Sequence, residues 1–255
     1  MAHDLFASLR GPAAPVRFIA SGRYLIDHAG RECGEERWSI EEGEAGPVAT
    51  GEQVLESPHP FPSRQEWRVR LTRAWRLSGI EIAWTVGTRR LRAVHGAEGE
   101  RWHARIEYGG EVREQQGDYP AGCEVEFASP LHHAFILARR DFALEGEHEF
   151  PVLRIGPPWM AVSPERMRIR CVELGRRDTP WGAAAAKRYV ASLLRPAPGG
   201  GYREDDQGYT FWADERGFVL ESHEGRTPTS PWMRLIEYTG RPWGGPAGGG
   251  ASWAS

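Results

Sequence analysis

The chain is poor in the features that mark several large classes of protein. Its 255 residues include three cysteines, an odd number at wide spacing, which excludes a disulfide-stabilised scaffold. No uncharged apolar stretch approaches the ~18–20 residues of a membrane-spanning helix. The formal net charge is −3, whereas a nucleic-acid-binding domain usually carries a basic excess. We therefore expect neither a transmembrane segment nor a nucleic-acid partner.

Lysine and the marks of secretion are also scarce. Lys187 is the only lysine, so almost all positive charge is arginine, which pairs with carboxylates in a planar, bidentate way and stacks on aromatic rings. Residues 1–10 contain an acid, no basic segment and no apolar run of ~7–15 residues, so they do not resemble a signal peptide. We expect a cytoplasmic protein with reduced thiols.

The usual motifs of catalytic and metal sites are missing as well. The sequence contains no HExxH, CxxC or HxH pattern and no GxSxG elbow. His132 and His133 form the only histidine pair, and adjacent side chains point to different sides of a helix, so they rarely chelate one ion unaided. We interpret them as ordinary helix histidines. The sequence thus predicts no catalytic residue, no metal and no cofactor.

The dominant pattern is a period of two. Apolar residues alternate with polar ones at residues 65–73, 80–86 and 101–108, with turn residues at short intervals, which predicts a meander of about five antiparallel strands over residues 64–119. Residues 182–194 contain four consecutive alanines and also alternate, so either a helix or a strand fits. Further strand candidates are residues 16–27, 32–40, 49–55, 147–154, 166–174, 209–213 and 218–222.

The strand candidates add up to an all-β fold. About eleven or twelve strands exceed what an open twisted sheet usually holds without curling, so we predict a large antiparallel barrel or half-barrel with one or two short helices. Residues 130–140 follow Ser129, a plausible N-cap, and predict a helix that caps or plugs the concave face. Residues 15–242 are expected to form one domain, with flexible termini at 1–14 and 243–255.

Charged residues follow the polar faces of the central strands. Arginines and glutamates alternate there on neighbouring strands, which favours cross-strand ion pairs on an exposed sheet face. A surface for anionic lipids or polyanions is the alternative. The residues concerned are Arg68, Arg70, Arg90, Arg92, Arg101 and Arg105, with Glu66, Glu81 and Glu107.

Aromatic residues occupy the apolar face of the same strands. A barrel of about ten or more strands is too wide for side chains to fill, and a cavity lined by tryptophan suits a lipid or another hydrophobic small molecule. A packed aromatic core is the alternative. The predicted cavity residues are Trp38, Trp67, Trp84, Trp102, Tyr108, Phe135 and Phe211.

This layout resembles that of a family of bacterial glycolipid-binding proteins. The resemblance rests on residues 22–26 (GRYLI) with 36–40 (ERWSI), the meander 69–108 followed by 128–131 (ASPL), and 172–174 (VEL) with 209–220 (YTFWADERGFVL). It implies a one-domain curled antiparallel sheet, similar in shape to the half-barrels of lipoprotein carriers, and an apolar ligand. No ligand residues carry over, because the family has no matching binding motif.

Non-enzymatic binding of a lipid-like or other hydrophobic molecule is therefore the first functional hypothesis. A hydrolase or isomerase that uses the barrel cavity is the second, with His133, His223 and Asp214 as the residues to test. A structural protein with a solid core is the third. The sequence does not fix the ligand or the oligomeric state.

Overall fold

The structure is a computed structural model that describes residues 17–156, 159–224 and 232–240. Within these ranges the chain forms fifteen strands and one helix. In chain order they are β1 (Arg17–His28), β2 (Arg31–Glu42), β3 (Pro47–Leu55), β4 (Ser63–Leu71), β5 (Leu77–Val86), β6 (Arg89–Glu98), β7 (Arg101–Tyr108), β8 (Glu111–Asp118), β9 (Glu124–Glu126), α1 (Leu131–Leu137), β10 (Glu147–Gly156), β11 (Ala161–Thr179), β12 (Gly182–Pro196), β13 (Tyr202–Asp214), β14 (Val219–Glu224) and β15 (Met233–Gly240). The predicted flexible termini lie outside the described residues.

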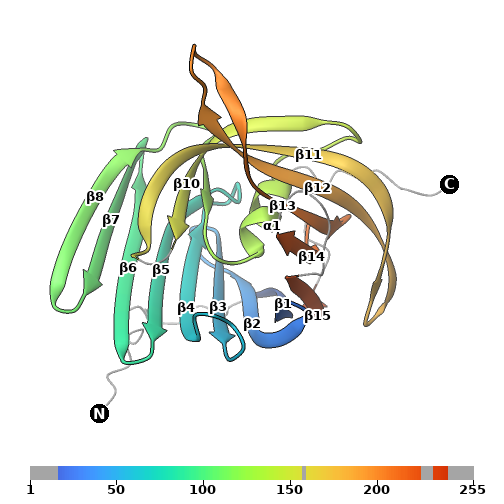
Figure 1. Ribbon diagram of the computed structural model, residues 1–255, viewed down its shortest axis with the longest axis horizontal. Helices are drawn as coiled ribbons and strands as arrows, with labels where there is room; N and C mark the ends of the chain where they lie inside the picture. The colour runs from blue at the N-terminus through green and yellow to red at the C-terminus, as the bar shows by residue number, and fades with distance from the viewer. Residues whose placement is uncertain (1–16, 157–158, 225–231, 241–255) are drawn as a thin grey trace.

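All these strands belong to one sheet that curls around α1 (Figure 1). The strand order is β8-β7-β6-β5-β4-β3-β2-β1-β15-β14-β13-β12-β11-β10-β9, so β1 and β15 join the two halves. Neighbours are antiparallel except β9 and β10, which run parallel. The backbone N–H of Val162 on β11 donates to Gln115 Oε1 on β8 at 3.0 Å, which connects the far sides of the curl. The predicted large antiparallel half-barrel is confirmed.

Tight glycine turns explain why consecutive strands pair. Gly109 and Gly110 join β7 to β8 with φ of 60° and 86°, a left-handed conformation that costs glycine little. The meander predicted over residues 64–119 is confirmed as β4 to β8. The segment 182–194, for which the sequence left helix and strand open, is a strand, β12. Strands β9 and β15 were not among the predicted ones.

The segment between β8 and β10 fills the concave side of the sheet. Every residue of α1 is buried, and Tyr119 and Phe127 place their rings 5.3 and 5.4 Å from those of Trp102 and Trp67. The predicted plug is therefore present, but it is shorter than residues 130–140. Its N-cap is Pro130 and not Ser129. The Ser129 Oγ still accepts a hydrogen bond from the backbone N–H of Leu131, at 3.2 Å.

The opposite face of β4 to β8 carries the charged residues. Arg70 of β4 pairs with Glu81 of β5 at 3.5 Å, and Arg105 of β7 with Glu114 of β8 at 3.4 Å. These contacts confirm the predicted cross-strand ion pairs for Arg70 and Arg105. The helix that the described residues contain, α1, is seven residues long, too short to cross a bilayer.

Candidate functional site

A small apolar pocket opens at one end of β5, β6 and β7. Its floor is a row of direct cross-strand partners: Trp84 of β5 faces Leu91 of β6, and Leu91 faces Tyr108 of β7. The row forms because the period of two puts all three side chains on the same face of the sheet. The pocket has a volume of about 220 Å³ and is lined by Trp84, Val86, Arg89, Leu91, Tyr108 and Trp159.

Trp159 closes one side of this pocket from a distant part of the chain. It precedes β11, and its ring meets that of Tyr108 edge-on, with the ring centroids 5.1 Å apart. The indole is 42% exposed, and the guanidinium of Arg113 lies 5.5 Å from the ring centroid. Arg89 is exposed at the rim. The pocket therefore combines three aromatic surfaces with cationic groups at its edge.

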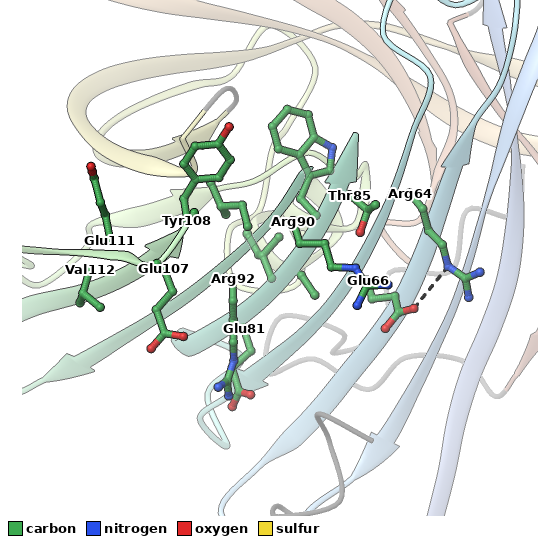
Figure 2. A pocket seen from close by; sticks show the side chains of 16 residues that line it. Arg64, Glu66, Glu81, Thr85, Arg90, Arg92, Glu107, Tyr108, Glu111 and Val112 are labelled. Carbon is green, nitrogen blue, oxygen red and sulfur yellow. Dashed lines mark ion pairs between the residues drawn. The ribbon is translucent and has the colours of Figure 1, made fainter. Parts of the chain in front are cut away.

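A larger hollow, of about 820 Å³, lies mainly on the charged face of the same strands (Figure 2). Figure 2 shows Glu107 and Tyr108, consecutive on β7, pointing to opposite sides of the sheet. The charges that line the hollow are nearly balanced, because three arginines face four glutamates. We therefore do not expect this hollow to select a strongly charged ligand. The charged residues are Arg64, Arg90, Arg92, Glu66, Glu81, Glu107 and Glu111.

Comparison with known proteins supports the fold. No family model and no curated protein matches the chain. A β-barrel-like protein of the domain of unknown function DUF1849 from Brucella abortus is 10% identical over 87% of this chain and 98% of its own, with a TM-score of 0.55. A DUF1089 family protein from Pseudomonas aeruginosa is 16% identical over 76% of this chain and 91% of its own, with a TM-score of 0.47. The fold is β-barrel-like. No family model supports the glycolipid-binding family itself.

The seven predicted cavity residues divide into two groups. Trp84 and Tyr108 are half-buried and line the pocket. The other five are buried in the core, where each ring packs against another aromatic ring. The pairs are Trp38 with Phe218 (centroids 5.4 Å apart), Trp67 with Phe127 (5.4 Å), Trp102 with Tyr119 (5.3 Å), Phe135 with Trp75 (6.5 Å) and Phe211 with Tyr189 (5.0 Å).

Sequence reasoning missed Trp159, Arg89 and the two aliphatic pocket residues. Val86 and Leu91 lie on predicted strands, at the same parity as Trp84. Trp159 had no such signal, because it lies in a proline-containing connector where no periodicity points to a partner.

The residues named for hydrolase or isomerase chemistry have separate partners. Asp214 Oδ1 accepts hydrogen bonds from the backbone N–H groups of Arg216 and Phe218, at 3.0 and 2.9 Å, and so orders its own turn. Burial raises the pKa of Asp214 although Arg216 opposes this shift. His223 Nε2 lies 4.0 Å from a carboxylate oxygen of its own strand, and His133 contacts Tyr209. Each of the three side chains therefore has its own partner, and these contacts do not join them in one catalytic cluster.

A buried hydrogen-bonded cluster of polar side chains lies inside the curl, around Ser129. Glu36 is fully buried, with Ser129 Oγ 2.6 Å and Gln53 Nε2 3.0 Å from its two carboxyl oxygens. Burial raises the pKa of Glu36 to about 8, against the effect of both hydrogen bonds. The backbone oxygen of Ser129 lies 2.6 Å from His132 Nδ1, so Ser129 connects Glu36 to the histidines of α1.

Proposed function

We propose that the chain binds a hydrophobic small molecule or a lipid-like molecule, without converting it, in the pocket of Trp84, Tyr108 and Trp159. The observation that carries this proposal is the exposure of Trp159 beside a preformed apolar pocket, whereas the aromatic residues deeper in the curl are covered. An exposed indole over an apolar hollow leaves surface that a ligand can remove from water.

The dimensions of the pocket limit what enters it. A volume of about 220 Å³ is below the ~300–1,000 Å³ typical of sites for drug-sized ligands. The pocket therefore suits one ring or a segment of one alkyl chain, and the rest of the ligand lies outside. Burial of each methylene contributes about 0.8 kcal/mol before the costs of association. Arg89 and Arg113 would then hold a polar or anionic end.

The lining also favours binding over catalysis. General acid–base chemistry needs a group that exchanges protons near the working pH, such as an imidazole or a carboxylate. The six lining residues are three aromatics, two aliphatics and Arg89, whose guanidinium stays charged. Such a set can hold a molecule and orient its polar end.

A titration with a fluorescent anilinonaphthalene dye tests this proposal. Trp159→Ala should weaken dye binding at least tenfold. Trp181→Ala is the matched control, because Trp181 is equally exposed, at 43%, but lies at the turn between β11 and β12. Native mass spectrometry before and after denaturing extraction should show a co-purifying apolar compound. Equal dye binding by the wild type and Trp159→Ala would reject this pocket as the site.

A further inference from the structure

Two adjacent histidines converge on one tyrosine in the core. His132 and His133, 6% and 4% exposed, lie on α1 with ring centroids only 3.7 Å apart. Their Nε2 atoms lie 3.4 and 2.8 Å from the hydroxyl oxygen of Tyr209, on β13. The expectation that adjacent histidines diverge fails here, because in this short helix both rings turn toward the same strand. The cluster is separate from the pocket of the proposed function.

The hydrogen-bond pattern leaves this cluster one donor short. His132 Nδ1 lies 2.6 Å from the carbonyl oxygen of Ser129 and carries its proton there. The carbonyl of Pro130 also hydrogen-bonds to the His133 ring, and because Nε2 of this ring faces Tyr209, we assign the proton to Nδ1. Each Nε2 then presents a lone pair. The single hydroxyl proton of Tyr209 can satisfy one of the two.

A positive charge close to the histidines is neutralised by its own partners. Arg154, whose charge acts on His132, is paired with Glu126 and Glu165 at 3.0 and 3.5 Å, so its positive charge is offset.

Each of the two histidines thus donates one ring N–H to a backbone carbonyl. A metal-binding histidine usually does the same, since it donates its other ring N–H to a backbone carbonyl or a carboxylate. We propose that His132 Nε2, His133 Nε2 and Tyr209 Oη bind a transition metal ion. Met167 Sδ, 3.7 Å from Tyr209 Oη, is the candidate for a fourth ligand. Two imidazoles with a thioether nearby favour copper over the harder divalent ions. On binding Cu²⁺, the phenol releases its proton to solvent and binds as a phenolate.

An entering ion would reach this site beside Tyr209, on β13. The ring of Tyr209 is only half-buried, while its hydroxyl is turned toward the two buried histidines. A rotation of this one side chain would open the histidines to an entering ion. An entry path of this kind is one requirement for a metal site that forms in a folded protein.

Copper loading of the purified full chain tests the site. After treatment with a chelator, the protein is incubated with Cu²⁺ and desalted, and bound copper is measured by elemental mass spectrometry. We expect one equivalent and a visible tyrosinate-to-copper charge-transfer band. His133→Gln should lose most of the copper. His103→Gln, an exposed histidine of β7, should retain the full equivalent.

Tyr209→Phe keeps the ring and removes the ligand oxygen, so it decides the question if His133→Gln fails to fold. Circular dichroism establishes that Tyr209→Phe is folded, and the charge-transfer band should disappear. Absence of bound copper in the wild type would overturn the proposal. Retention of the full equivalent and an unchanged visible spectrum in Tyr209→Phe would overturn it as well, because the copper would then lie elsewhere.

Discussion

Gly51 of β3 and Trp67 of β4 are direct cross-strand partners, and the indole of Trp67 lies over the bare glycine backbone. A Cβ atom on Gly51 would lie 2.2 Å from Trp67 Cζ2. Gly22 and Trp38 repeat the relationship between β1 and β2, where the Cβ would lie 2.5 Å from the ring. Glycine opposite tryptophan lets a large ring lie flat against a curled sheet and fill its concave side.

Gly51→Ala should therefore destabilise the protein. The added methyl group forces Trp67 off its position in a close-packed core, and overpacking of this kind costs about 1–3 kcal/mol. Gly96→Ala on β6 is the control, because a Cβ there meets nothing within 4 Å. Urea unfolding should show a lower free energy of unfolding for Gly51→Ala and a value within about 0.5 kcal/mol of wild type for Gly96→Ala. An equal loss of stability in the two variants would show that the effect comes from replacing any strand glycine, and not from the contact with the Trp67 indole.

Core and pocket tryptophans should respond differently to truncation. Trp67 is 2% exposed, so Trp67→Ala leaves a cavity and should lower the free energy of unfolding by about 3–5 kcal/mol. Trp159→Ala removes a side chain that is 42% exposed and has one aromatic partner, Tyr108, and should lower it by about 1–2 kcal/mol. Thermal and urea denaturation of both variants check this. A large loss in Trp159→Ala would mean that this indole is structural, and it would remove the support for the pocket as a ligand site.

The sequence predicted the meander correctly because alternation is a local property. Each strand from β4 to β7 carries its own period of two, and the Gly109–Gly110 turn adds β8, which is exposed along nearly its whole length, so no distant information was needed. The alanines of β12 carry no such signal, and the strand forms because it pairs with β11 and β13. The three residues of β9 are too few to show a period.

The candidate sites depend on contacts that no local pattern encodes. Trp67 and Trp84 share one face of the sheet, yet Phe127 covers the first whereas the second stays half-buried beside the pocket. The difference comes from where distant connectors pack on that face. The turn of His132 and His133 toward Tyr209 is a long-range contact of the same kind.

A buried carboxylate fixes the C-terminal end of the plug. Glu124 of β9 is 3% exposed and pairs with Arg139 and Arg140, the latter at 2.7 Å. Removal of one partner leaves poorly solvated charges, so Glu124→Ala should lower the free energy of unfolding by about 3–5 kcal/mol. Asp118→Ala, which breaks an exposed pair with Arg101, should cost less than about 1 kcal/mol. Similar urea midpoints for the two variants would contradict the role given to Glu124.

Glu36 should make the stability of the protein fall as the pH rises. Its pKa is about 8 in the folded state, because of burial, against about 4.3 in an unfolded chain. Between these values the folded protein holds a proton that the unfolded chain has released. Its contribution to stability is therefore greatest below about pH 4 and is lost progressively up to about pH 8.

Glu36→Gln removes this titration and keeps a side chain of the same shape beside Ser129 and Gln53. The stability of the variant relative to wild type should rise with pH, by up to about 1.4 kcal/mol per unit between pH 5 and 8. Urea unfolding at several pH values measures this difference. Glu66→Gln, which removes an outward-facing carboxylate, controls for the loss of one negative charge. If the stability of Glu36→Gln and of wild type changed with pH in the same way, Glu36 would be ionised in the folded protein. The hydrogen bonds from Ser129 and Gln53, and not protonation, would then offset the cost of burying its carboxylate.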